Sequence, residues 1–548
     1  MDDEGLIEHG RQVATGTFWG LVGTFFTKVV SFLYTVYVAR AVSQGDIGLF
    51  YLSLGFVGLF IIWKDFGLSS AITRYVPYYE SQGEGKKAKH LLESSYAIAA
   101  VSGIFFTITI WLAADSIGAI YQNQALPEAL KLMSFFMLLD NLSRISAAYL
   151  GGKAEIKLGQ VMGTVSVITK LILTYALFQL YGANYQSMTL AFLGSALVPL
   201  AISTPWIIRI VKSSPASGSA LAKNEMLREI VPFGIMLTLV QAFYGLISSI
   251  DRLLIGYLVP QTVAIGAVAV YSLAITLSIN VTVFPGLVGN IFLPLISRMV
   301  GKHDHDGIKR SIGTAQRWVL LLTLPVILVL IVFANEMMTE FFGSPYGQGG
   351  MVAAIFAFGL GFTAYSYIIG LALAGMRLVK LELQIAVVGA VANILLNLLL
   401  IPSFGAEGAA AAAAASFAIM AMMFMHYGKT ILGFHPSRNT HKIIALGFAL
   451  LLIIYAAKPH FAYLGEMPPD WLGEGELAKY AQKTAYLAFL GVVLASVYVL
   501  YWLLALLFKC FEWEDVRVFS NMAKKTRLPK NILEFVETML MTRVRRPE

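Results

Sequence analysis

Apolar stretches of about twenty residues recur along almost the whole chain, and they constrain its fold more than any other feature. A helix of that length spans the roughly 30 Å hydrocarbon core of a bilayer. Only 13% of the 548 residues are charged, against about 25% in soluble proteins. So few charges cannot cover a water-exposed surface of this size. The sequence therefore predicts an all-α polytopic membrane protein.

The apolar stretches predict about fourteen transmembrane helices. The first is too long for the apolar region of a cleavable signal peptide, and the residues before it are acidic rather than basic. We therefore expect it to stay in the membrane. The expected spans lie near residues 16–39, 47–72, 92–114, 128–150, 159–181, 187–211, 230–256, 263–293, 317–334, 351–376, 383–402, 406–428, 441–457 and 484–508.

Lysine and arginine are concentrated in every second connection between these spans. One connection contains Lys86, Lys87 and Lys89, whereas residues 182–186 and 257–262 carry no charge. Because positive residues are retained on the cytoplasmic side, the basic connections are expected there. An even number of spans then places both termini in the cytoplasm. We expect a multi-pass protein of the plasma (inner) membrane.

A glycine-to-proline spacing occurs twice in distant parts of the chain. Gly48 precedes Pro77 by 29 residues, and Gly266 precedes Pro294 by 28. Such long-range similarity indicates an internal repeat, and repeats with an even number of spans keep the same orientation in the membrane.

A second spacing agrees with this repeat, because 12 residues separate Lys170 from Gly182 and 12 separate Asn393 from Gly405. Two six-helix lobes related by an axis along the membrane normal are expected, able to rock about a site between them. The predicted organisation is a cytoplasmic N-terminus (1–15), an N-terminal lobe (16–211), a cytoplasmic linker (212–229), a C-terminal lobe (230–428), two additional transmembrane helices (441–508) with an external loop (458–483), and a basic cytoplasmic tail (509–548).

Two motifs connect the chain with a known family. Residues 65–71 read Asp-Phe-Gly-Leu-Ser-Ser-Ala, and Arg74 and Tyr75 follow them. The second motif comprises Asn393, Asn397, Ile401, Pro402, Gly405, Glu407, Gly408, Ala409 and Ala410. Both resemble Wzx-type polysaccharide flippases of the multidrug/oligosaccharidyl-lipid/polysaccharide exporter superfamily, over essentially the whole chain. The second motif is shared with relatives that move other cargo, and the alanine run that follows departs from the usual pattern.

Ionisable side chains also fall inside the expected spans, where charges normally face a protein interior or a wet cavity. The scaffold glycines and prolines recur between the two halves, whereas these charges do not, which favours a role beyond folding. Candidates for a cationic, substrate-binding cavity are Lys28, Lys64, Lys170 and Arg252, with Arg144 at its entrance. Candidates for ion coupling or charge pairing are Asp65, Asp140 and Asp251.

Structural roles stay open for several of these charges. Lys64 and Asp65 can neutralise each other, and Asp140 and Arg144 are spaced for an i,i+4 pair. The long side chain of Lys28 can extend to the membrane boundary. Each of these structural roles is an alternative to a place in the cavity.

Lys170 is harder to explain structurally, because it lies about eleven residues from either end of its span. Asp251 and Arg252 are adjacent and point about 100° apart on a helix, so they cannot both face one neighbour. Buried ammonium and guanidinium groups can replace the lost hydration of a phosphate or pyrophosphate.

The charges suggest only a phosphate or pyrophosphate group. The family resemblance implies the whole cargo, which is an oligosaccharide on a polyisoprenyl (pyro)phosphate. We expect a flippase that moves it from the cytoplasmic to the outer leaflet by alternating access, for cell-surface polysaccharide or glycan assembly. Glycan polymerases or glycosyltransferases are candidate partners, and nucleic acid is not. No cofactor is expected. Residues 83–87 lack the first glycine and the Ser/Thr of a nucleotide-binding loop. The membrane potential, or coupling to H⁺ or Na⁺, is the expected energy source.

Other classes of function make different predictions. A multidrug antiporter of the same superfamily, exporting cationic amphiphiles, would need a cavity dominated by carboxylates. A membrane glycosyltransferase or ligase would act on sugar without translocation, and no nucleophile–base or metal-bound motif supports an enzyme. A passive scaffold is the last alternative. The run His303–Asp306 is expected to be a solvated loop rather than a metal site.

Overall fold

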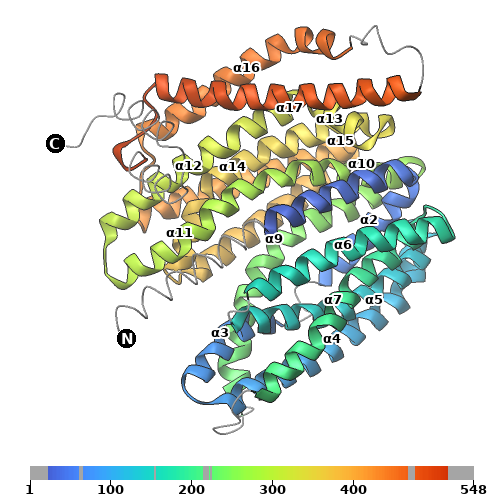
Figure 1. Ribbon diagram of the computed structural model, residues 1–548, viewed down its shortest axis with the longest axis vertical. Helices are drawn as coiled ribbons and strands as arrows, with labels where there is room; N and C mark the ends of the chain where they lie inside the picture. The colour runs from blue at the N-terminus through green and yellow to red at the C-terminus, as the bar shows by residue number, and fades with distance from the viewer. Residues whose placement is uncertain are drawn as a thin grey trace. The chain divides into compact units, whose positions relative to one another are not determined.

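The computed structural model describes residues 23–60, 66–153, 156–213, 221, 225–466 and 476–515. Within these residues the chain forms long helices and no strands (Figure 1). The expected N-terminus 1–15, residues 467–475 of the external loop and residues 516–548 of the basic tail lie outside the described residues. The all-α class predicted from the sequence is confirmed.

The helices follow one another with short connections. In chain order they are a helix over 23–41, α2 (Gln44–Leu59), α3 (Leu68–Ser81), α4 (Gly85–Ile120), α5 (Leu126–Gly152), α6 (Ile156–Tyr181), α7 (Tyr185–Ser213), the π-helix η2 (Met226–Ile230), α9 (Val231–Leu258), α10 (Gln261–Ile279), the 3₁₀ turn η3 (Asn280–Thr282), α11 (Val283–Gly301), α12 (His305–Val332), α13 (Ala334–Phe342), the 3₁₀ turn η4 (Ser344–Gly349), α14 (Gly350–Gly375), α15 (Val379–Thr430), α16 (Arg438–Glu466) and α17 (Glu476–Leu507).

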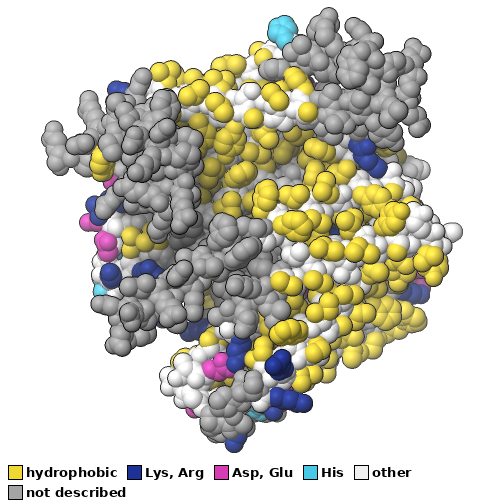
Figure 2. Space-filling model, in the orientation of Figure 1, with side chains coloured by type: hydrophobic (Ala, Val, Ile, Leu, Met, Phe, Trp, Pro, Cys, Tyr) yellow, Lys and Arg dark blue, Asp and Glu magenta, His cyan; other side chains and the backbone are white. Residues whose placement is uncertain are grey.

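Ten helices of the described part are long and apolar enough to cross a membrane, so the chain is a polytopic membrane protein. Broad areas of the surface in Figure 2 carry apolar side chains, as a lipid-facing surface requires. The predicted count of about fourteen is not confirmed. The first two expected spans include residues outside the described ones, and α5 carries four charged side chains that lower its mean hydropathy.

The long helix α15 contains a reversal of the chain. Gly405 has φ +55° and ψ −131°, which a residue inside a helix does not adopt. A side-chain carbon at Gly408 would lie 2.5 Å from the carbonyl oxygen of Leu400. In a continuous helix, residues eight apart are about 12 Å distant. The chain therefore folds back at Gly405, between the predicted spans 383–402 and 406–428.

The helices pack into two compact units. The first comprises Met1–Thr276 with Ala386–Ala413, and the second comprises Leu277–Ile385 with Ala414–Glu548. The first unit therefore joins the N-terminal helices with three later elements, which are α9, α10 and the first half of α15. The predicted lobes 16–211 and 230–428 divide the chain differently, since they were defined by sequence similarity rather than by packing, and they stay a prediction.

Two breaks in the helices follow the predicted repeat. Phe66 and Gly67, at φ +48° and +75°, separate α2 from α3, and the η3 turn separates α10 from α11. Each break falls between the glycine and the proline of the repeated spacing. Only glycine fits at position 67, because a side-chain carbon there would lie 1.9 Å from the carbonyl carbon of Gly234. The glycine of the first family motif thus has a structural explanation.

Helix α2 packs against α9 and approaches the start of α10. A side-chain carbon at Gly48 would meet the carbonyl oxygen of Ile265, and the Gln44 side chain donates a 3.3 Å hydrogen bond to the carbonyl of Gly266. Gly48 and Gly266 are counterparts in the predicted repeat, and each lies beside the helix that carries the other. Gly58 packs closely against Ser249 of α9, as small residues do between membrane helices.

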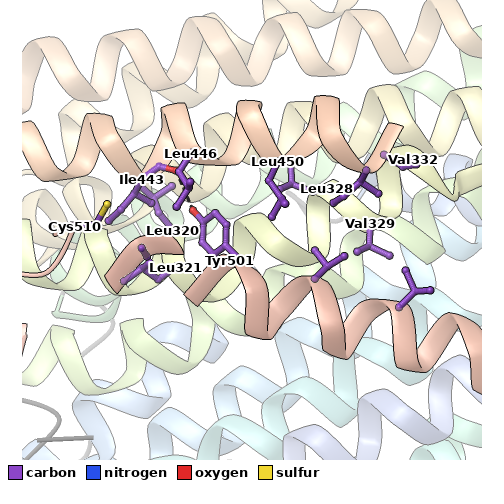
Figure 3. Close-up of a cluster of buried hydrophobic side chains, with 14 of the residues drawn as sticks. Leu320, Leu321, Leu328, Val329, Val332, Ile443, Leu446, Leu450, Tyr501 and Cys510 are labelled. Carbon is purple, nitrogen blue, oxygen red and sulfur yellow. Dashed lines mark hydrogen bonds between the residues drawn. The ribbon is translucent and has the colours of Figure 1, made fainter. Parts of the chain in front are cut away.

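The second unit contains a core between α12, α16 and α17. Figure 3 shows Leu320, Leu328, Ile443 and Leu450 facing one another from α12 and α16, with the Tyr501 ring of α17 between them. The Tyr501 hydroxyl donates a 3.0 Å hydrogen bond to the carbonyl of Ile443, so the buried phenol is not left unpaired. The two C-terminal helices are therefore packed firmly on α12.

Candidate functional site

Lys170 is the most distinctive charge of the first unit. It lies in α6, inside an apolar candidate span over Val161–Tyr181. Its Nζ atom is 4.1 Å from the centre of the Tyr34 ring and 6.0 Å from that of Phe192. A desolvated cation–π contact contributes about 2 kcal/mol, far less than the hydration that an ammonium loses. Among the described residues no carboxylate pairs with Lys170.

Asp251 is fully buried on α9 and is hydrogen-bonded through both oxygens. The Tyr271 hydroxyl of α10 donates to one oxygen, and the Asn397 amide of α15 donates to the other at 2.6 Å. The Asn397 amide also donates to the Asn393 side-chain oxygen at 3.1 Å. The Asn397 oxygen and the Asn393 amide nitrogen are buried without a partner in the described part of the chain. The cluster therefore has unused oxygen and nitrogen atoms.

Arg252 points away from this cluster, as the helix geometry predicts for adjacent residues. Its Nε donates a 3.2 Å hydrogen bond to the Ser272 hydroxyl, and its guanidinium lies 5.6 Å from the centre of the Tyr51 ring. Asp251 and Arg252 therefore do not form an ion pair with each other. A guanidinium has five N–H donors, so this contact leaves capacity for an anion.

A set of aromatic rings connects the surroundings of Lys170 and Arg252. Phe192 is 5.6 Å from Phe50, and Phe50 is 5.4 Å from Tyr51, measured between ring centres. Lys170 contacts the first ring of this set and Arg252 contacts the last. The two cations thus border one aromatic cluster within the first unit.

The predicted repeat pairs the surroundings of Lys170 with different residues in the other half. Tyr34 precedes Gly48 by 14 residues, as Arg252 precedes Gly266, and Asn393 is the counterpart of Lys170. The ammonium and tyrosine of one half therefore correspond to an asparagine and an arginine in the other.

The remaining candidates differ in their surroundings. Arg144 pairs with Asp140 at 2.9 Å on α5 while remaining half exposed, so the i,i+4 pair that the sequence left open is formed. Lys28 is exposed on the helix over 23–41. Lys64 and Asp65 lie outside the described residues. Of the four predicted cations that lie in the described part of the chain, Lys170 and Arg252 border a common cluster.

The histidine–aspartate run has ordinary structural partners. Asp304 accepts a 2.8 Å hydrogen bond from the backbone N–H of Gly307 and so caps the start of α12. Asp306 is 3.5 Å from Lys309. These contacts account for both carboxylates of the run.

Comparisons with known proteins agree with the fold and the motifs. The chain is 21% identical to an uncharacterised membrane protein of Methanocaldococcus jannaschii, over 73% of this chain and 81% of that one. It is 23% identical to a probable low-salt glycan biosynthesis flippase of Haloferax volcanii, over 74% of this chain and 81% of that one.

Two solved structures show the same fold. The lipid II flippase MurJ in an inward closed conformation aligns with a TM-score of 0.66 at 16% identity, over 88% of this chain and 97% of that one. An inward-facing multidrug resistance MATE family transporter of the MOP superfamily aligns with a TM-score of 0.61 at 15% identity, over 73% and 94%. The family model described as polysaccharide biosynthesis protein matches residues 13–300. That match spans more than half of the chain, which therefore belongs to the polysaccharide biosynthesis protein family, as its motifs predicted.

Proposed function

We propose that the protein is a flippase that moves an oligosaccharide, linked to a polyisoprenyl (pyro)phosphate, from the cytoplasmic to the outer leaflet. The observation that carries this proposal is Lys170, a cation inside an apolar helix whose described neighbours are aromatic rings rather than carboxylates. Charges at such depth are expensive and mark substrate or ion pathways. An anionic headgroup would supply the missing counter-charge, and Arg252 on the same aromatic cluster would supply a second contact.

Alternating access is the proposed mechanism. The two repeats would rock about their common axis, with the phosphate and sugar in a polar interior and the lipid tail left in the bilayer. We place the protein in the plasma membrane with both termini in the cytoplasm, because lysine and arginine are concentrated in alternate connections. The relative from Haloferax volcanii, a probable glycan biosynthesis flippase, supports a glycan cargo.

The test is translocation in proteoliposomes. Fluorescent polyisoprenyl-pyrophosphate glycans are incorporated into both leaflets, and a membrane-impermeant quencher is added outside. We expect the protein to increase the fraction of lipid that becomes accessible, and protein-free vesicles to show no such increase. Transport of ethidium-like cations without movement of the glycolipid would instead identify a multidrug antiporter.

Asp251 is the proposed coupling residue. Its carboxylate is fully buried, and neighbouring amide atoms of Asn393 and Asn397 are unpartnered, so a proton or Na⁺ could be accommodated there. Asp140 is a weaker candidate because Arg144 already neutralises it. Binding of a cation at Asp251 in one orientation and its release in the other would link translocation to an ion gradient.

Asp251→Asn should remove this coupling. The amide keeps the shape of the side chain and cannot carry a negative charge, so we expect gradient-driven translocation to fall about tenfold, or about 1.4 kcal/mol in activation free energy. The measurement is the translocation rate with an imposed H⁺ or Na⁺ gradient and without one. Asp140→Asn is the matched control and should keep its response to the gradient. An unchanged response in Asp251→Asn would exclude this carboxylate as the coupling group.

A further inference from the structure

The second unit contains a groove among four of its helices. The walls of the groove come from α12, α14, the second half of α15 and α16, and its volume is about 470 Å³. Phe358, Met422 and Phe448 line the groove and are also exposed, so it opens to the surface of the unit. All four helices belong to candidate membrane spans. The opening of the groove therefore faces the hydrocarbon of the bilayer.

The walls of the groove exclude water. Apart from Tyr365, every residue that lines it is apolar or is glycine. A water molecule needs two to four polar partners, which these walls do not provide. An empty space of this size is also unfavourable, because the atoms that line it lose their dispersion contacts on one side. A hydrocarbon occupant satisfies the walls without either cost.

Small residues leave the space open without being needed for close helix packing. A side-chain carbon at Gly447 would lie 3.6 Å from the side chain of Leu324, and one at Gly361 would lie 3.9 Å from that of Ile327. Both distances are ordinary contacts. At Gly359, by contrast, a side-chain carbon would lie 2.7 Å from the Cα atom of Ala414, so glycine is required there. The glycines of the groove therefore have no packing reason within the described chain, but they make room for another molecule.

The groove is elongated along the helix axes. On α12 its wall runs from Leu320 to Ile331, a rise of about 16 Å along the helix. One leaflet contributes about half of the roughly 30 Å hydrocarbon core, or about 15 Å. One chain of a bilayer lipid therefore matches the groove in length as well as in polarity.

We propose that this groove binds one hydrocarbon chain of an ordinary bilayer phospholipid. The chain fills the space beside Gly361 and Gly447 and packs α16 against the other three helices. Leu320 and Leu328 line the groove and also belong to the core that holds the C-terminal helices (Figure 3). The bound lipid thus extends that core. The proposal does not depend on the proposed function, because the site lies wholly within the second unit.

The polyisoprenyl chain of the proposed cargo is a rival occupant. Polar groups give a binding site its preference for one ligand over another, and these walls offer almost none. Bulk phospholipid is far more abundant in the membrane than a carrier lipid. Mass action therefore favours the phospholipid chain.

Photolabelling from within the bilayer tests the proposal. The full chain is reconstituted in phosphatidylcholine vesicles containing some phosphatidylcholine with a diazirine at the end of one acyl chain, and labels are mapped to single residues after illumination. We expect labels on Leu328 and Ala421, which line the groove but are only 5% and 3% exposed. Leu321 and Met420 are equally buried on the same helices without lining the groove, and they should stay unlabelled.

Filling the groove should remove these labels. Gly447→Leu places an aliphatic side chain in the space, so we expect labelling of Leu328 and Ala421 to fall about tenfold. Ala456→Leu, at an exposed position on the same helix, is the matched control and should be labelled as wild type. The exposed Leu452 should be labelled equally in all proteins. If Gly447→Leu does not fold, Ala418→Leu fills the groove from α15 and should have the same effect.

Three results would overturn the proposal. The first is labelling of Leu452 without labelling of Leu328 and Ala421 in the wild type, which would mean that no lipid chain enters the groove. The second is undiminished labelling of these two residues in a folded filled variant. The third is loss of their labels on adding a small amount of polyisoprenyl phosphate but not on adding the same amount of unlabelled phosphatidylcholine, which would assign the groove to the carrier chain. None of these measurements uses translocation, so the proposed function can fail while the lipid site stands.

Discussion

Replacing Lys170 with glutamine should lower glycolipid translocation at least tenfold while the protein stays folded. The ammonium is the mid-span charge that would meet the cargo's phosphate, and losing one partner of a desolvated pair costs about 1.4 kcal/mol or more. The Tyr34 and Phe192 rings lose only a cation–π contact. Removal of an ammonium without a described counter-ion also relieves a desolvation cost. We therefore expect thermal stability to be unchanged or raised. Initial translocation rates and the unfolding midpoint of each variant check both parts.

Two further variants show whether charge or position matters. Lys170→Arg keeps the positive charge and should retain more translocation than Lys170→Gln. Lys89→Gln removes an exposed lysine that pairs with Glu93 at the start of α4, and should translocate as wild type. Wild-type translocation by Lys170→Gln would contradict the proposed role. A lower unfolding midpoint together with lost translocation would indicate a structural lysine instead.

Much of the fold could be predicted because the amino-acid composition of a segment identifies it as a membrane-spanning helix. Each span is a continuous apolar stretch, so its approximate position needs no long-range information. The repeated 12-residue spacing that ends at Gly182 and Gly405 could also be found in the sequence alone. Both glycines have positive φ at chain reversals. The division of the helices into two packed units could not be predicted from the sequence. It depends on which helices meet, and α9 and α10 pack with the N-terminal helices although the repeat assigns them to the second lobe.

The site was predicted only in part, for a related reason. The Asp140–Arg144 pair is visible in the sequence because its members are four residues apart. The partners of Asp251 come from α10 and α15, and Asn397 is 146 residues away. The sequence nonetheless contains a signal of a buried polar contact. Asn393 and Asn397 lie one turn apart within an apolar stretch, and buried amides need polar partners. Their contact with the carboxylate required the structure.

Arg317 is a buried charge that the sequence does not reveal, because it stands at the first residue of the expected span 317–334. It is 2% exposed on α12 and binds two carboxylates that follow α17. Its Nε is 2.9 Å from Asp515, and its Nη1 is 2.7 Å from Glu512. Asp515 is itself buried and accepts the backbone N–H of Glu512 at 2.8 Å. This network fixes the start of the C-terminal tail on α12.

Arg317→Ala should therefore destabilise the protein by about 3–5 kcal/mol, the usual cost of leaving a buried charge unpaired. Asp515 would be left buried beside Glu512, so the two carboxylates would repel each other as well. Replacing Arg317, Glu512 and Asp515 together with Met, Leu and Leu should restore most of the loss, because no unpaired charge then remains. Equilibrium unfolding in mixed detergent micelles measures both. A single variant as stable as wild type would mean that the network is solvated, and the tail would then be free of α12.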